Sequence, residues 1–151
     1  MELKVKKLNE EAVIPFQKYE EDFCYDIVAT SKKYLNDNKT KIEYGTGLSF
    51  EIKKEDLIPS ITVRPRSSIH NTGLILSNSE GTIDYGYIGE IKLVFYKVIE
   101  GVEYEIGDKI GQMFIQERKP ITFIEVSELN NTERSNKGFG STGVKHSKPK
   151  I

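Results

Sequence analysis

The sequence predicts an all-β protein, either a barrel or a sandwich of short strands, and three observations support this fold class. Apolar and polar residues alternate in several short runs, as they do in half-buried strands. Gly, Pro, Asn or Asp bounds each run, as expected at turns. No segment shows a sustained helical apolar repeat with caps, so any helix should be short. The 151 residues suit one domain with a substantial core.

Seven runs carry the strand signal. The first, LKVKKL, alternates apolar and polar side chains, and KIEYGTGLSFEI does so on both sides of a Gly-Thr-Gly break. SITVRPR is β-branched, TGLILS is apolar, and EIKLVFYKVI is the longest β-rich run. KIGQMFIQ and ITFIEVSE complete the set. In chain order the runs occupy residues 3–8, 41–52, 60–66, 72–77, 90–99, 109–116 and 121–128.

The end of the chain has a different composition. The segment NNTERSNKGFGSTGVKHSKPKI is rich in Asn, Ser, Gly and Lys, and Phe139 is its one aromatic residue. Such a segment cannot bury enough apolar surface to order itself. We therefore expect a β domain over residues 1–130 and a flexible C-terminal arm over residues 131–151.

Composition and charge exclude several function classes. The net charge of −1 gives no general attraction to nucleic acid or to an anionic membrane. No apolar run approaches the roughly 18 residues of a membrane span, and MELKVKKLNE lacks the apolar core of a signal peptide. One cysteine, Cys24, excludes an internal disulfide, and with two His it makes a weak zinc set. A cytoplasmic protein is expected.

The segment GTIDYGYIGE, residues 81–90, combines three glycines, two tyrosines and Asp84. Glycine permits a sharp turn and lets a ligand approach main-chain groups, which could pair with the edge of a nucleobase. Strand alternation would put Ile83 and Tyr87 on one face and Asp84 on the other, although a turn can override it. Taken alone, such a segment is more often a tight turn with a solvated Asp.

Two further segments could bind phosphate. In RPRSS, Arg66 supplies a planar fork of donors, and Ser67 and Ser68 add hydroxyl groups. In GDKIGQMFI, Gln112 is a polar residue in an apolar run and needs a partner, either main chain or ligand. Taken alone, RPRSS is more often a polar strand end, and both interpretations of Gln112 stay open.

Two more segments are uninformative in isolation. The Gly-rich segment RSNKGFGSTG, residues 134–143, could close over a nucleotide, with Phe139 stacked on the base and Arg134 near the phosphates. A Gly-rich tail is more often a flexible end, and this one lacks the Gly-Lys-Ser/Thr ending of a P-loop. In YDIVAT, Asp26 could orient a hydrated metal ion or cap a turn.

The order of these segments is more specific than any one of them. The run YDIVA, RPRSS, NSEGTIDYGYIGEI, GDKIGQM and RSNKGFGSTG resembles the five ordered motifs of the trimeric dUTP pyrophosphatase (dUTPase) family, over residues 23–143. YGTGLSFEI is also similar to the Thr-Gly-Leu strand of that family. The resemblance implies a distorted jelly-roll-like β-barrel, the β-clip fold, with a mobile C-terminal tail.

The resemblance also implies hydrolysis of dUTP to dUMP and pyrophosphate. Asp84 matches the residue that activates the attacking water and contacts the deoxyribose 3′-hydroxyl. Asn78 and the hairpin main chain, including Gly81 and Ile83, would recognise the uracil edge. Tyr87 would pack under the deoxyribose, where a ribose 2′-hydroxyl would clash.

The metal ion and the phosphates have matching residues elsewhere. Asp26 matches the aspartate that binds Mg²⁺ through water, and Phe139, followed by Gly140, would stack on uracil. The positions that would contact phosphate are Arg66, Ser67, Ser68, Gln112, Arg134, Ser141 and Thr142. The family implies a homotrimer whose sites are shared. The third motif comes from one chain, the first, second and fourth from another, and the tail from a third.

The sequence departs from the family pattern at a few positions. Phe23 and Cys24 stand where Ala-Gly is usual, which affects the metal side of the site. Tyr85 stands where a small or acidic residue is common, and Ile88 where a basic or polar one is common.

Three alternatives use the same scaffold. The dCTP deaminase family shares the trimeric fold, but its general-base Glu would stand at Val94, so deamination is not expected. A non-catalytic nucleotide sensor or protein-binding regulator stays open, although Asp84 and the tail are both present. A barrel with no site would require five coincidences in the right order.

Overall fold

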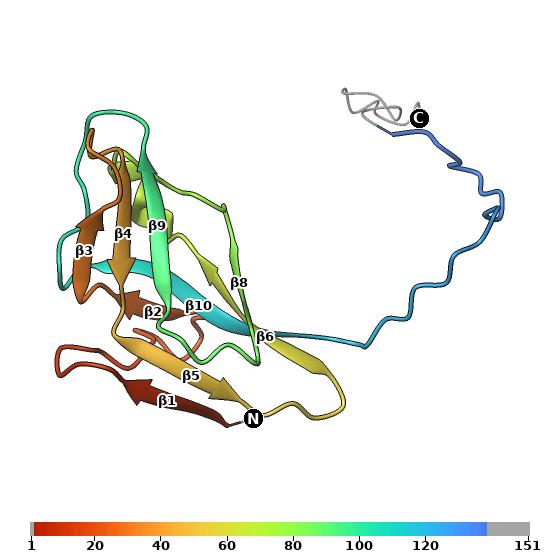
Figure 1. Cartoon of the computed structure of the whole chain (residues 1–151), viewed down its shortest axis with the longest axis horizontal. Coiled ribbons are helices and arrows are strands. Elements are labelled where there is room, and N and C mark those ends of the chain that lie inside the picture. The colour runs from red at the N-terminus through yellow and green to blue at the C-terminus, as the bar shows by residue number, and fades with distance from the viewer. Residues whose placement is uncertain (1, 139–151) are drawn as a thin grey trace, which may run out of the picture. The chain divides into compact units, whose positions relative to one another are not determined.

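The computed structural model describes residues 2–138 (Figure 1), and the contacts between residues divide the chain into two units, Met1–Pro120 and Ile121–Ile151. The all-β prediction is confirmed, because the described part of the first unit consists of strands and one short 3₁₀ helix. In chain order these are β1 (Leu3–Lys7), β2 (Tyr25–Val28), β3 (Ser31–Tyr34), β4 (Lys41–Gly45), β5 (Leu48–Ile52), β6 (Ile58–Arg64), η1 (Ser67–Asn71), β7 (Leu74–Leu76), β8 (Gly81–Asp84), β9 (Lys92–Lys97) and β10 (Lys109–Arg118).

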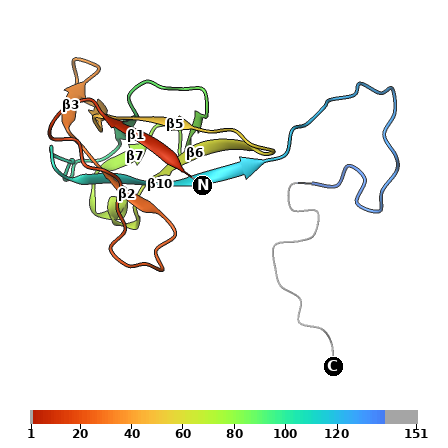
Figure 2. The same cartoon turned by 90° about the horizontal axis from the view of Figure 1, so that it is seen from below.

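The strands of the first unit form three antiparallel sheets. Two sheets have four strands, in the orders β2-β10-β6-β8 and β3-β4-β9-β7, and a third pairs β1 with β5. Figure 1 shows β3, β4 and β9 side by side, and Figure 2 shows β1 beside β5 and β2 beside β10. Because β10 lies between β2 and β6, three sequence motifs that are far apart in the chain meet in one sheet.

The core is formed by the inward faces of the sheets. Alternation along β4 and β9 points Ile42 and Tyr44, and Leu93 and Phe95, inward, where all four are buried. The rings of Tyr44, Phe95 and Tyr104 pack edge to face, with centroids 5.6–6.1 Å apart.

Six of the seven predicted runs contain strands. The run 41–52 divides into β4 and β5 at Gly47, whose φ of 64° lies in the left-handed region that favours glycine. β3 (sequence SKKY) was not predicted, because it is an edge strand with mostly exposed polar side chains and has no apolar alternation. The one helix in the described part of the chain is the five-residue 3₁₀ helix η1, which agrees with the expectation that any helix would be short.

The predicted strand ITFIEVSE is wrong for this structure. Residues 121–138 contain no strand, and apolar side chains such as Phe123, 91% exposed, face solvent. Pro120 lacks an N–H for a sheet ladder, and within residues 2–138 no strand pairs with this segment. Four predicted site residues, Phe139, Gly140, Ser141 and Thr142, lie outside the described residues. The arm boundary at residue 131 and the mobility of the tail stay predictions.

Candidate active site

The segment that follows β8 turns back on itself immediately after Asp84. The residues Tyr85 and Gly86 form the turn, and the Tyr87 N–H donates to the Asp84 carbonyl at 2.9 Å. β8 is held in place by β6, with Asp84 opposite Ser60. The turn overrides strand alternation, so Asp84 and Tyr87 do not lie on opposite faces.

Asp84 and Tyr87 line the same cavity, of about 260 Å³. The Asp84 side chain is exposed, and half of the Tyr87 side chain is exposed. The lining residues are Thr82, Ile83, Asp84, Tyr87, Glu90, Ile91 and Lys92. A hydrated carboxylate beside an aromatic ring and main-chain edges is suited to hold a small polar molecule and to orient a water next to it.

A second cavity, of about 340 Å³, collects the predicted phosphate and metal residues. Asp26 comes from β2, Gln112 and Lys109 from β10, and Arg66 precedes η1. The lining residues are Phe16, Gln17, Lys18, Tyr19, Asp22, Phe23, Cys24, Asp26, Arg66, Ser67, Lys109 and Gln112. The order β2-β10-β6 in the sheet explains why these segments meet.

Asp26 pairs with two cations at the edge of this cavity. Its Oδ1 accepts from the Arg66 Nε at 2.7 Å, and its Oδ2 lies 2.8 Å from the Lys109 Nζ. The Asp26 side chain is 15% exposed, while those of Arg66 and Lys109 are about a third exposed, so the carboxylate is the more shielded partner of both pairs. The cluster leaves a net positive charge facing the cavity, which favours an anionic ligand.

Lys109 was missed as a site residue in the sequence. The register of β10 against β2 shifts between Lys109 and Gly111, which is a β-bulge around Ile110. The bulge buries Ile110 in the core and leaves both Lys109 and Gln112 at the cavity. Strict alternation, which placed Ile110 on the same face as Gln112, does not hold here. The one sequence feature that could have identified Lys109 as a site residue is its position directly after the Gly107-Asp108 turn.

Arg66 and Gln112 are fixed by neighbouring polar groups. The Arg66 Nη1 donates to the Ser68 hydroxyl at 3.3 Å, while its Nε donates to Asp26. The Gln112 amide donates to the Pro65 carbonyl at 2.9 Å, so the main-chain alternative for this residue is observed, although Gln112 also lines the cavity. These bonds orient the guanidinium before any ligand arrives.

Two observations bear on the chemistry of the second cavity. Burial raises the pKa of the Cys24 thiol, which keeps it protonated and disfavours a nucleophilic role. In residues 2–138 no group of three or more His, Cys, Asp or Glu side chains is placed to hold a metal ion. Two carboxylates, Asp22 and Asp26, line this cavity, and Mg²⁺ needs no larger cluster because it keeps much of its water and takes ligands from phosphates.

The predicted residues fall into two groups, because the two cavities share no lining residue. The predicted residues Ser68 and Gly81 line neither cavity, and neither does Asn78. Asn78 lies in the turn before β8, where its amide nitrogen would be 3.2 Å from a Cβ at Gly81. Arg134 belongs to the second unit, where its Nε donates to the Lys137 carbonyl at 3.2 Å.

The described residues include no helix that is long and apolar enough to cross a membrane.

These features define a class: a small β protein whose two polar cavities suit a phosphorylated ligand. The chain matches the family model of dUTPase over residues 10–143. It is 39% identical over 146 residues to the deoxyuridine 5′-triphosphate nucleotidohydrolase of Clostridium kluyveri, covering 95% of this chain and 99% of that one. It is 39% identical over 145 residues to the protein of the same name from Nautilia profundicola, with 95% and 99% covered. The chain belongs to the dUTPase family, as its motifs predicted.

Solved structures confirm the dUTPase-like fold. A mutant dUTPase of Staphylococcus bacteriophage 80alpha, solved with dUpNHpp, is similar with a TM-score of 0.76 and 22% identity, covering 95% of this chain and 99% of that one. A mutant dUTPase from phage phi11 of S. aureus has a TM-score of 0.70 and 18% identity, covering 87% and 100%. The phi11 structure coordinates a structural Mg(II) ion.

Proposed function

We propose that this protein hydrolyses dUTP to dUMP and pyrophosphate, as its family membership implies. The observation that carries the proposal is the turn after β8, which puts the Asp84 carboxylate and the Tyr87 ring in one cavity. In this arrangement one residue can activate water while its neighbour contacts the sugar. If the segment were only a turn that connects two strands, neither a carboxylate at residue 84 nor an aromatic ring at residue 87 would be needed.

The proposed reaction is a single displacement at the α-phosphorus. Asp84 accepts a hydrogen bond from a water molecule, orients it and takes its proton as the water oxygen attacks in line. The bond from the α-phosphorus to the bridging oxygen breaks, and pyrophosphate leaves with that oxygen. No covalent intermediate is needed. Because the Asp84 side chain is exposed, a water molecule can reach its carboxylate oxygens.

Arg66 and Lys109 would stabilise the charge that gathers on the phosphate oxygens. Asp26 holds both cations in place and would also contact Mg²⁺ through water. When bound, Mg²⁺ would offset negative charge on the triphosphate. Tyr87 would pack under the deoxyribose, and the main chain of residues 81–87 would pair with the uracil edge. A mismatched base would leave buried polar groups unpaired there.

We infer that the site is completed in a homotrimer. The two cavities share no residue within one chain, so a site that needs both Asp84 and Arg66 is naturally formed between two chains. The arm, with Arg134, Phe139, Gly140, Ser141 and Thr142, would then come from a third chain and close over the nucleotide.

Subunit mixing tests the reaction and the shared site together. Asp84→Asn and Arg66→Ala homotrimers are each expected to lose dUTP hydrolysis. After unfolding and refolding a one-to-one mixture, about a quarter of the sites should combine Asp84 from one chain with Arg66 from another, and activity should return. Wild-type protein refolded in the same way is the control. No recovery in the mixture, with an active control, would contradict the shared site.

A further inference from the structure

The corner between β4 and β5, residues Gly45–Ser49, holds the segment that follows Tyr87. We call these five residues the GTG corner. Thr46 donates both its N–H and its hydroxyl to the Ile91 carbonyl, at 3.2 and 2.8 Å. The Leu48 carbonyl accepts the Ile91 N–H at 2.9 Å. Thr46, Leu48 and Ile91 are buried, so this end of the hairpin is fixed to the core.

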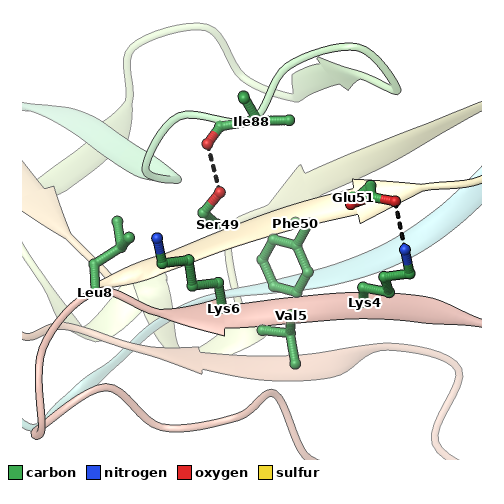
Figure 3. Close-up of a pocket in the computed structure, with 8 residues that line it drawn as sticks. All are labelled: Lys4, Val5, Lys6, Leu8, Ser49, Phe50, Glu51 and Ile88. Atoms are coloured by element: carbon green, nitrogen blue, oxygen red, sulfur yellow. Dashed lines mark hydrogen bonds and ion pairs between the residues drawn. The ribbon is translucent and has the colours of Figure 1, made fainter.

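Two more bonds join the GTG corner to the hairpin. The Ser49 hydroxyl donates to the Ile88 carbonyl, as Figure 3 shows above the paired strands β1 and β5. The Glu90 carboxylate accepts the Gly47 N–H at 2.9 Å. A Cβ at Gly45 would lie 2.5 Å from the same carboxylate oxygen, so Glu90 fits against a glycine that leaves room for it. The GTG corner thus holds both Ile88 and Glu90, the residues on either side of Gly89.

The Tyr87 ring is held in turn by the segment that the corner anchors. Its hydroxyl donates to the Glu90 carbonyl at 3.1 Å. The ring lies over Gly89, where a Cβ would be 2.5 Å from the ring Cζ and 3.0 Å from Cε2. The backbone of Gly89 is not left-handed, so a larger residue here would not strain the backbone, but its Cβ would displace the Tyr87 ring.

We propose that Gly89 and the GTG corner are positioning elements for Tyr87, and that they set how strictly the site rejects ribonucleotides. The inference rests on the proposed function, in which Tyr87 packs under the sugar. Tyr87 is half exposed and follows an exposed turn, so the position of its ring depends on the Gly89 surface and on the Glu90 carbonyl. Gly89 supplies the surface under the ring, and the corner supplies the fixed carbonyl of Glu90.

The experiment compares Gly89→Ala with Ile88→Ala. The second variant removes a side chain that is 72% exposed in the same hairpin and keeps the carbonyl that Ser49 contacts. Values of kcat/KM are measured for dUTP and UTP, with the melting temperature of each variant as a control for folding. We expect Gly89→Ala to lower the dUTP-to-UTP ratio at least tenfold through a displaced ring, while Ile88→Ala keeps the wild-type ratio. An unchanged ratio in folded Gly89→Ala would overturn the proposal.

The contribution of the corner is tested by Ser49→Ala, which removes one bond to the hairpin. Its dUTP-to-UTP ratio should fall at least threefold, and a wild-type ratio would remove the corner from the proposal. Crystal structures of wild type, Gly89→Ala and Ile88→Ala without nucleotide give a readout that does not depend on activity. If wild type fails to hydrolyse dUTP, the proposed function is wrong. The displacement of the Tyr87 ring in Gly89→Ala then still decides whether Gly89 positions it.

Discussion

Replacement of Asp26 by Asn should destabilise the protein, because one partly buried carboxylate holds two cations. Asp26 is 15% exposed and lies 2.7 Å from the Arg66 Nε and 2.8 Å from the Lys109 Nζ. Asn keeps the shape of the side chain and removes its charge. The two cations are then left close together without the anion that offsets them.

The size of the effect follows from the exposure of the three groups. Loss of one partner from a fully buried ion pair costs roughly 3–5 kcal/mol. The side chains of Arg66 and Lys109 are 31% and 34% exposed and can regain water. We therefore discount the cost to about 2 kcal/mol. For a chain of this size that corresponds to a fall of about 4–8 °C in melting temperature.

The assay is thermal unfolding followed by circular dichroism at a fixed protein concentration, since assembly makes the melting temperature depend on concentration. Asp84→Asn is the matched control, because Asp84 is exposed and an exposed substitution shifts stability by about 0.5 kcal/mol or less. Asp84→Asn should abolish turnover and leave the melting temperature unchanged. An Asp26→Asn protein as stable as wild type would refute the reasoning.

Three further predictions concern pH, the arm and the metal ion. Burial alone would raise the pKa of Glu103, but hydrogen bonds from Lys32, Tyr34 and Lys97 outweigh it and hold that pKa below 4.5. Its stabilising effect is therefore full above about pH 4.5 and is lost as pH falls through the lower, folded-state pKa. The gap in melting temperature between wild type and Glu103→Gln should be constant near neutral pH and close in acid; a gap independent of pH would contradict this. Truncation after Asn131 should leave a folded trimer by light scattering with much weaker dUTP hydrolysis, and full activity would exclude the arm from the mechanism. Chelation with EDTA should reduce turnover, and added Mg²⁺ should restore it; turnover indifferent to both would remove the metal ion from the account.

Most of the fold could be predicted because β-strands leave a local signal. Alternation and β-branched residues mark β1, β6 and β9 without knowledge of their partners. β3 escaped because an edge strand with polar side chains has no such signal. ITFIEVSE has the composition of a strand, but a strand also needs a pairing partner, and composition does not encode where the partner is.

The site was predictable in residue type more than in geometry. Asp26, Arg66 and Gln112 were identified through ordered motifs, and the sheet order brings them to one cavity. Two local irregularities were not visible in the sequence pattern. The turn after Asp84 places that residue in the same cavity as Tyr87. The bulge at Ile110 places the Lys109 ammonium next to the Asp26 carboxylate. Both break the two-residue period on which strand arguments depend.

The most direct test of the central claim is pyrophosphate release from dUTP, dCTP, dTTP and UTP, measured in parallel with Mg²⁺. The account predicts fast pyrophosphate release from dUTP alone. UTP should give no release because Tyr87 excludes the ribose, and dCTP should give none because the hairpin edge rejects cytosine. No release from any of the four nucleotides would contradict the account. The same scaffold would then be studied as a nucleotide-sensing or protein-binding regulator.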